Sequence, residues 1–183
     1  MRIHIAYATK EGQTAKIANY IAEVVRAQGH QVDTVEIVHA EEVVPAGFDG
    51  VIVGSSIHMG KHDKHAAEYV RYNREALEKV PSAFFSVSLA AHGDEAEAEG
   101  YVEAFENETG WRPEQVALFA GALPYTRYGF LKRPLMKKIA GDKPGSLGTD
   151  TSRDYVYTEW DGVSRFTEAF LERLPSPDHT ASA

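Results

Sequence analysis

Short apolar runs alternate with amphipathic segments along most of this 183-residue chain. The runs are rich in Val, Ile and Phe, and they lie near residues 2–8, 32–38, 50–55, 82–89 and 116–122. The third and fourth runs are almost continuously apolar, as expected for strands that are buried on both faces. Parallel strands need crossover connections, which helices between the runs would supply. The alternation therefore predicts an α/β fold, with a five-stranded parallel sheet covered on both faces by helices.

Helical spacing supports this prediction, because apolar positions share one helical face within residues 14–25, 66–80 and 163–174. The sequence contains no internal repeat or low-complexity tract, and its length fits one domain. We therefore predict a single domain over residues 1–174, with an insertion at 124–150 and a disordered tail at 175–183. Tyr69, Trp111 and Trp160 are interpreted as packing aromatics.

Composition excludes several function classes. The formal net charge of -8 argues against general nucleic-acid binding, which needs a basic face. The absence of cysteine excludes disulfides, thiolate metal sites and cysteine nucleophiles, so any redox chemistry needs a bound cofactor. The chain begins directly with a strand-like segment, and nowhere do about 18 apolar residues run together. We expect a cytoplasmic protein that does not span a membrane.

The loop after the first predicted strand, residues 9–14, precedes the first predicted helix. Free backbone N–H groups and the helix dipole make such a position suitable for an anion. The loop has neither a Walker lysine nor the dinucleotide-binding glycines, and its donors are neutral, which suits a terminal monophosphate. The expected contacts are Thr9, Lys10, Glu11, Gly12, Gln13 and Thr14. The alternative is purely structural: Thr14 caps the helix and Gly12 makes the turn.

Two further loops follow the third and fourth predicted strands. In a doubly wound sheet of order 2-1-3-4-5, ligands bind beyond the carboxyl ends of the strands, at the switch point that these loops border. A flat ring system could lie between them, hydrogen-bonded by backbone groups. The candidate contacts are Ser55, Ser56, Ile57, His58, Met59 and Gly60 in one loop, and Ser88, Leu89, Ala90, Ala91, His92 and Gly93 in the other. The alternative is ordinary serine-rich loop chemistry.

The histidine-rich stretch 58–65 could suggest a metal site. Its spacing follows no ligand motif, so we predict none. Instead, His62 and His65 are expected at an exposed helix start, with Asp63 as the cap. We assign no catalytic acid or base.

Several blocks of the sequence are similar to known families. Residues 9–14 (TKEGQT) resemble the FMN phosphate loop of flavodoxins. Five further blocks resemble the menaquinone-dependent protoporphyrinogen oxidases, namely GSSI (54–57), PSAFFSV (81–87), WRP (111–113), AGALPYTRY (120–128) and VYTEW (156–160). The resemblance covers residues 1 to about 174.

This resemblance implies a flavodoxin-like fold with an inserted segment after strand 5. It also implies FMN as cofactor, oxidation of protoporphyrinogen IX to protoporphyrin IX in haem synthesis, and delivery of electrons to a membrane quinone. The alternative function is a flavodoxin-like electron carrier, or a general quinone reductase without porphyrin specificity. The segment 124–150 favours the enzyme, because it is too long for a plain connection and a simple carrier does not need it.

The segment 127–138 is basic within an acidic chain, and it contains no acidic residue. Pro134 could start a short helix that Gly141 ends, with apolar and basic residues arranged amphipathically. We expect such a segment to rest peripherally on an anionic membrane surface or to hold porphyrin carboxylates. The candidate contacts are Arg127, Lys132, Arg133, Lys137 and Lys138. The alternative is a solvated basic face whose apolar side packs on the domain.

Overall fold

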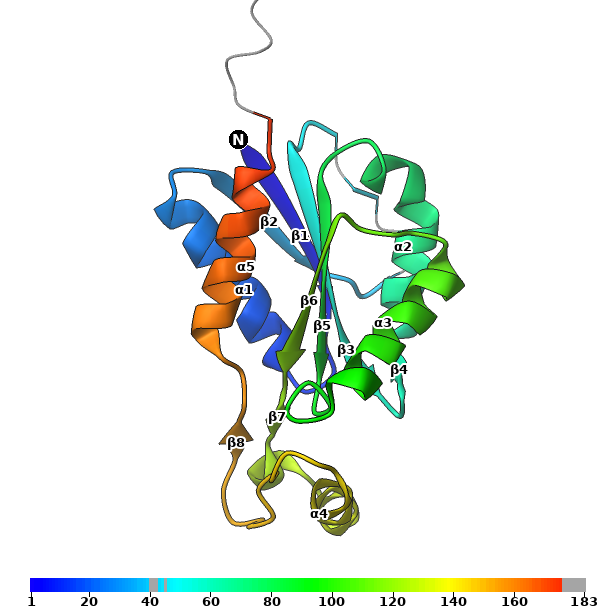
Figure 1. Ribbon diagram of the computed structural model, residues 1–183, viewed down its shortest axis with the longest axis vertical. Coiled ribbons are helices and arrows are strands. Elements are labelled where there is room, and N and C mark those ends of the chain that lie inside the picture. Colours follow the sequence, from blue (N-terminus) through cyan, green and yellow to red (C-terminus); the bar gives the residue numbers. More distant parts are fainter. Residues whose placement is uncertain (40–42, 45, 176–183) are drawn as a thin grey trace, which may run out of the picture.

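The computed structural model describes residues 1–39, 43–44 and 46–175, and its centre is a parallel β-sheet (Figure 1). Five parallel strands follow the order β2-β1-β3-β5-β6. Their bounds are Gln31–Glu36, Arg2–Ala8, Gly50–His58, Ser82–Ser88 and Gln115–Ala120. The short strand β4 (Lys61–His62) pairs antiparallel with the end of β3. The predicted order of the five parallel strands is therefore confirmed, and β4 is an addition that the sequence did not reveal.

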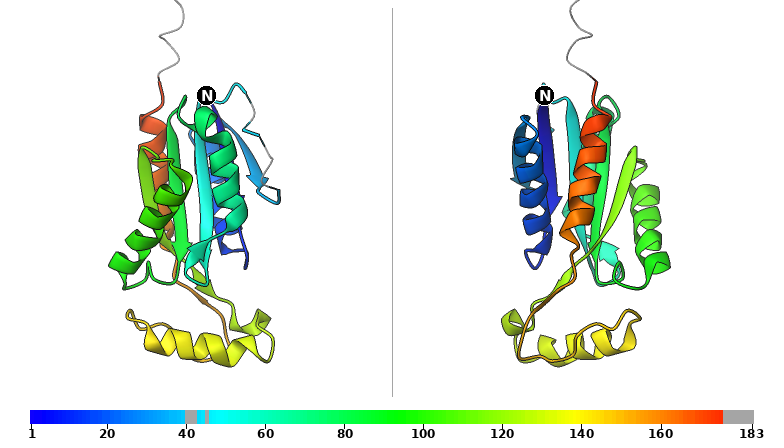
Figure 2. Two further views of the ribbon diagram at one scale, coloured as in Figure 1. Left: turned by 90° about the vertical axis from the view of Figure 1, so that its right-hand side faces the viewer. Right: turned by 60° about the vertical axis from the view of Figure 1, so that its left-hand side comes forward.

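Helices cover both faces of the sheet, as Figure 2 shows. Helices α1 (Gln13–Ala27) and α5 (Trp160–Glu172) lie on one face, and α2 (Lys64–Leu77) and α3 (Glu95–Thr109) lie on the other. Successive residues of a strand point to opposite faces of the sheet. Ile52 and Phe85 pack towards α1 and α5, whereas Phe84 packs towards α2 and α3. This alternation explains the continuously apolar runs, because both faces of these strands are buried.

The remaining elements form the insertion below the carboxyl ends of the strands (Figures 1 and 2). Strands β7 (Ala122–Leu123) and β8 (Tyr155–Val156) form an antiparallel ribbon, which connects to the short 3₁₀ helix η1 (Tyr125–Arg127) and to helix α4 (Lys132–Asp142). The helix predicted from Pro134 is confirmed, but it starts two residues earlier, which places Pro134 in the first turn, where its missing N–H costs no hydrogen bond. The insertion has a buried cluster of its own, consisting of Leu123, Tyr125, Tyr128, Ala140 and Leu147.

The packing roles predicted for the large aromatics are confirmed. Tyr69 and Trp111 are buried in the cluster under α2 and α3, and Trp160 packs against the opposite cluster. No helix in the described ranges is both long and apolar enough to span a bilayer. Of the predicted tail, only Pro175 lies within the described residues.

Candidate ligand-binding cleft

A cleft lies at the carboxyl ends of β1, β3 and β5, and the insertion forms its opposite wall. It encloses about 890 Å³ of empty space, part of which is open to solvent. The floor is formed by residues of the first loop and by the ends of β3 and β5. The insertion contributes Pro124, Arg127, Tyr128, Lys132, Met136, Asp154, Tyr155 and Val156. The cleft therefore occupies the switch point predicted from the strand order.

The first loop leads into α1, and no side chain in the described part of the chain caps this helix start. Gly12 occupies the cap position with φ +89°, a left-handed conformation that favours glycine, and its N–H donates to Thr9 Oγ1 over 3.1 Å. The Thr14 hydroxyl is buried, and it has no hydrogen-bond partner among the residues that the structure describes. The capping interpretation of Thr14 is therefore wrong. A phosphate group fits here, because it would accept from this hydroxyl and from the N–H groups of the helix start.

Other residues of the same loop hold it in place. Gln13 Nε2 donates to Thr158 Oγ1 over 2.9 Å, and Thr158 Oγ1 donates to the carbonyl of Ala120. Lys10 Nζ lies 3.2 Å from Asp63 Oδ2, so this cation is engaged with the start of α2. Thr158, which the sequence showed only as part of a resembling block, thus links α1 to the end of β6.

The second predicted loop, residues 55–60, is not all loop, because β3 continues to His58 and only Met59 and Gly60 form the turn to β4. Ser56, Ile57 and His58 line the cleft, and the buried Ser56 hydroxyl is a second one that lacks a partner among the described residues. Ser55 Oγ instead accepts from the Asp63 N–H over 3.2 Å. Met59 and Gly60 form the tight turn between β3 and β4 with positive φ, and they do not line the cleft. Met59 is 90% exposed.

The start of α2 confirms one prediction and corrects another. Asp63 caps the helix by accepting the His65 N–H over 2.9 Å, as predicted. His62 was predicted at an exposed position, which is wrong, because its ring packs edge-on against Phe84 and Phe105. Its Nε2 lies 2.9 Å from Ser86 Oγ, and burial lowers the pKa of His62 to about 4. The antiparallel pairing of β4 with β3 turns this side chain inward, and the sequence carried no signal for that pairing.

The third predicted loop, residues 88–93, lines the cleft with its first residues and contacts the insertion with its last. Ser88 and Leu89 line the cleft, and Ser88 Oγ accepts from the Ala91 N–H over 3.1 Å. Ala90 is buried, and the His92 ring contacts Tyr157 at a centroid distance of 4.5 Å. Gly93 meets Gly145 so closely that a Cβ on Gly93 would lie 2.5 Å from the Cα of Gly145. The far half of the loop therefore holds the insertion and does not line the cleft.

Two Lys–Glu–Tyr clasps tie the ends of α4 to the rest of the domain, one to the first loop and the other to helix α3. In the first clasp, Lys132 pairs with Glu11, and Tyr128 donates to the same carboxylate over 2.8 Å. In the second clasp, Lys143 pairs with Glu97, which also accepts from Tyr101 over 2.5 Å. Burial and the adjacent Glu11 raise the pKa of Tyr128, and the hydrogen bond from Lys143 is the largest cause of the lowered pKa of Glu97. The clasps join residues that are distant in sequence.

The five basic residues predicted as one contact surface are separated in the structure. Lys132 belongs to the first clasp, and Arg133 donates to the carbonyls of Tyr125 and Tyr128 within the insertion. Arg127 lines the cleft, whereas Lys137 and Lys138 are exposed and do not line it. The sequence also missed Lys16, which lines the cleft from the first turn of α1.

Comparison with known proteins agrees with this arrangement. A family model described as a flavodoxin domain matches residues 4–150. The chain is 33% identical to a protein of Escherichia coli K12 named protoporphyrinogen IX dehydrogenase [quinone], over 97% of this chain and 98% of that protein. A protein of Leishmania major with the same name is 35% identical, over 90% of this chain and 72% of that protein.

Solved structures with a similar fold include two flavodoxins of Bacillus cereus. Oxidised flavodoxin 1 superposes with a TM-score of 0.54 at 14% identity, covering 96% of this chain and all of that chain. Oxidised flavodoxin 2 superposes with a TM-score of 0.52 at 22% identity, covering 95% of this chain and 100% of that chain. At these identities the likeness concerns the fold alone.

Proposed function

The chain belongs to the flavodoxin-domain family and to the protoporphyrinogen IX dehydrogenases [quinone], and from this premise we propose that it oxidises protoporphyrinogen IX to protoporphyrin IX. FMN is the cofactor, and a quinone accepts the electrons. The observation that carries the proposal is a cleft in which the first loop, whose buried Thr14 hydroxyl has no partner among the described residues, faces the insertion that covers it. A plain electron carrier has no need of such a roof, which makes the carrier the weaker alternative.

The residues present fit FMN. The Thr14 hydroxyl and the backbone N–H groups at the start of α1 would hold the phosphate. Ser56 to His58, Ser88 and Leu89 would surround the ring, while the remaining residues of the two later loops would support them. When bound, FMN accepts hydrogen from a substrate and passes electrons to an acceptor. The protein would contribute position, a partly enclosed space and the hydrogen bonds of these loops.

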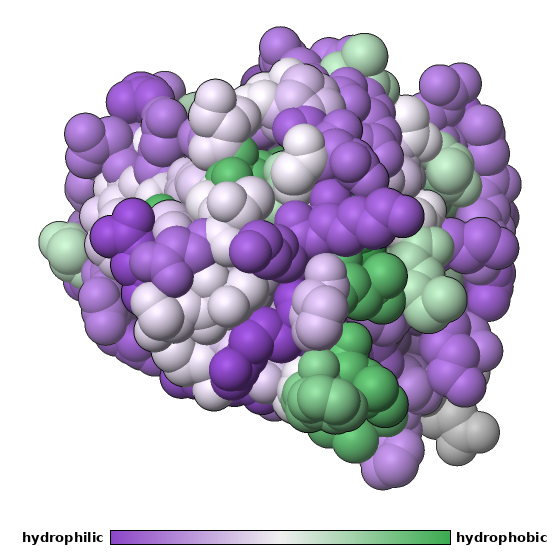
Figure 3. Space-filling model, turned by 90° about the horizontal axis from the view of Figure 1, so that it is seen from below, coloured by the Kyte–Doolittle hydropathy of each residue, from purple (hydrophilic) through white to green (hydrophobic). Residues whose placement is uncertain are grey.

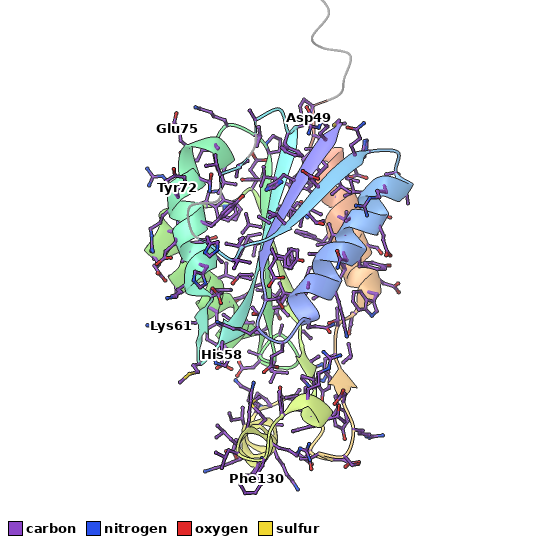
Figure 4. All side chains as sticks on the ribbon, turned by 180° about the vertical axis from the view of Figure 1, so that it is seen from behind. Asp49, His58, Lys61, Tyr72, Glu75 and Phe130 are labelled. Atoms are coloured by element: carbon purple, nitrogen blue, oxygen red, sulfur yellow. The ribbon has the colours of Figure 1, made fainter. Side chains whose placement is uncertain are left out.

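We also propose that the insertion contacts an anionic membrane surface, where a lipid-soluble quinone would be collected. Phe130, Leu131 and Leu135 are 88%, 81% and 57% exposed, and Lys137 and Lys138 lie on the same helix as Leu135. Figure 4 shows Phe130 pointing away from the sheet at the end of the molecule, and Figure 3 shows apolar areas beside hydrophilic ones on this side. Such a mixed surface suits the interface of an anionic bilayer.

The central experiment measures anaerobic turnover of protoporphyrinogen IX by porphyrin fluorescence, with a menaquinone analogue as acceptor. FMN-loaded protein should form protoporphyrin IX, and protein stripped of FMN should not. A parallel assay replaces the porphyrinogen with NAD(P)H. Quinone reduction with NAD(P)H alone, without porphyrin formation, would instead support the general quinone reductase.

FMN affinity tests the assignment of the phosphate loop. Thr14→Ala should weaken FMN binding by about 1.5–3 kcal/mol, the contribution of one hydrogen bond to a charged group. The matched control Thr14→Ser keeps the hydroxyl and should bind nearly as well as the parent protein. Equal FMN affinity of all three proteins, measured by flavin fluorescence quenching, would remove Thr14 from the phosphate site.

Vesicle sedimentation tests the membrane contact independently of turnover. The double variant F130S/L131S should sediment less with phosphatidylglycerol vesicles, and binding of the parent protein should decrease as salt increases. Neutral phosphatidylcholine vesicles are the control for the electrostatic contribution to vesicle binding. Unchanged sedimentation of the variant would show that these side chains do not reach the bilayer.

A further inference from the structure

Two of the four lysine and arginine side chains that line the cleft are engaged in ion pairs. Lys10 pairs with Asp63, and Lys132 pairs with Glu11. The other two cations in the cleft lining are Lys16 and Arg127, and neither forms an ion pair within 4.0 Å in the part of the chain that the structure describes. Both side chains are exposed at the cleft. The cleft therefore offers two cations that are available to a ligand.

Lys16 and Arg127 both line the cleft, although α1 contributes one and η1 the other. Asp154, which also lines the cleft, lies close enough to both that their charges help to lower its pKa, after the larger effect of its hydrogen bonds from Thr126. Both Asp154 oxygens accept from Thr126, one from the N–H over 2.8 Å and one from the hydroxyl over 2.9 Å. Asp154 thus braces the η1 turn that carries Arg127.

The neighbouring surface suits a large apolar ligand body. Leu89, Met136, Tyr155 and Val156 line the same cleft and supply apolar and aromatic contacts. A chain with a formal net charge of -8 would repel a ligand carrying two carboxylates unless cations were placed where those carboxylates arrive. Arginine provides a fork that matches a carboxylate, and lysine provides a compact charge with three donors.

We propose that Lys16 and Arg127 form a carboxylate-binding subsite that recognises the propionate groups of the tetrapyrrole substrate. The inference rests on the proposed function, because it assumes that the cleft takes a porphyrinogen. It assigns Arg127 and Lys16 to substrate selection, and it leaves Lys132 and Arg133 as structural residues of the insertion. It also predicts that the enzyme prefers tetrapyrroles whose propionate side chains are free acids.

The test compares binding of protoporphyrin IX with that of its dimethyl ester, which has the same ring but no free carboxylate. Both are titrated into FMN-loaded protein in the same detergent, and porphyrin fluorescence is followed. The parent protein should bind the diacid more tightly than the ester. The double variant K16Q/R127Q should bind the diacid roughly tenfold to a hundredfold more weakly, as expected when hydrogen bonds to charged groups are lost, and it should bind the ester unchanged.

The matched control is R26Q/K64Q, which removes one arginine and one lysine that are exposed and lie outside the cleft lining. It should bind both porphyrins like the parent protein. Equal loss of diacid binding in the control would assign the effect to overall charge and overturn the subsite. A weaker FMN affinity in K16Q/R127Q, without a change in diacid preference, would assign the two cations to the phosphate and overturn it as well.

Failure of this inference and failure of the proposed function give different results. If the parent protein oxidises protoporphyrinogen but binds diacid and ester equally, only the carboxylate subsite is wrong. If it binds neither porphyrin and forms no protoporphyrin, the proposed function is wrong and the subsite fails with it. Thermal unfolding of each variant confirms that these surface substitutions leave the fold intact.

Discussion

The two walls of the cleft are stabilised by different interactions: the floor is formed by the strand ends, and the roof is formed by the insertion. The floor consists of strand ends in a parallel sheet, with a large buried cluster on each face. The roof has a separate cluster of five buried residues, against which Leu89 of the third loop packs. It is also attached by two Lys–Glu–Tyr clasps, by the contact of His92 with Tyr157 and by the close approach of Gly93 to Gly145. Partly exposed ion pairs contribute little individually, whereas apolar burial contributes most of the folding free energy. We therefore expect the roof to move at a much lower free-energy cost than the floor.

The largest expected effect comes from overpacking the floor. A Cβ on Gly54 would lie 1.9 Å from Cζ of the fully buried Phe85, so Gly54→Ala should lower the free energy of unfolding by about 3 kcal/mol. Gly121→Ala is the control, since its Cβ would lie 3.6 Å from Val87, an ordinary contact. Urea unfolding followed by circular dichroism measures both. Similar midpoints for the two variants would show that the sheet is not tightly packed at Gly54.

Lowering the pH should destabilise the sheet, because the partly buried His62 side chain resists protonation in the folded protein. Its pKa is about 4 in the folded protein against an ordinary value of 6.5, so the unfolded chain binds the proton more readily. The free energy of unfolding is therefore highest above pH 6.5, and it decreases by at most roughly 3 kcal/mol as the pH falls towards 4. His62→Gln removes the titration, and its unfolding free energy should fall less over this range. Parallel pH profiles of the two proteins would contradict the assignment.

A smaller effect is expected where the roof meets the floor. Gly145 has φ +98°, and a Cβ there would lie 2.0 Å from the carbonyl oxygen of His92. Gly145→Ala should raise the free energy of the docked insertion by about 1–2 kcal/mol through left-handed strain, with a further cost from the overlap. Hydrogen exchange should accelerate in α4 while the sheet amides remain protected. Gly141→Ala is the control, because its Cβ would meet no atom of the described residues within 4 Å. Loss of sheet protection in the Gly145 variant would show that roof and floor unfold together.

The smallest effect should come from one clasp. Glu11→Gln removes the charge that pairs with Lys132, and it should cost about 1 kcal/mol or less because both side chains are partly exposed. Hydrogen exchange should increase at the start of α4, and added salt should reduce the difference from the parent protein. Glu97→Gln is the matched change at the other end, where the increase should appear near Lys143. Uniform acceleration along α4 in both variants would mean that the helix is released as one unit.

Much of the fold could be predicted because its signals are local. Burial on both faces makes β3 and β5 continuously apolar, and helical periodicity marks α1, α2 and α5. The position of residues 9–14, between a strand and a helix, was sufficient to predict an anion site. Even Asp63 could be identified as a cap, since capping depends on residues that are adjacent in sequence.

The sequence by itself determined the alternation of strands and helices, the place of the cleft and the basic character of the insertion, because these follow from periodicity, topology rules and composition. The order of the strands was what the resemblance to flavodoxins implied. Only the tertiary structure decided which cations remain available. Lys132 meets Glu11 across 121 positions of sequence, and Lys143 meets Glu97 across 46. Such pairings depend on how separate elements pack, and local patterns carry no information about them. For the same reason, the burial of His62 became evident only when β4 was seen to pair with β3.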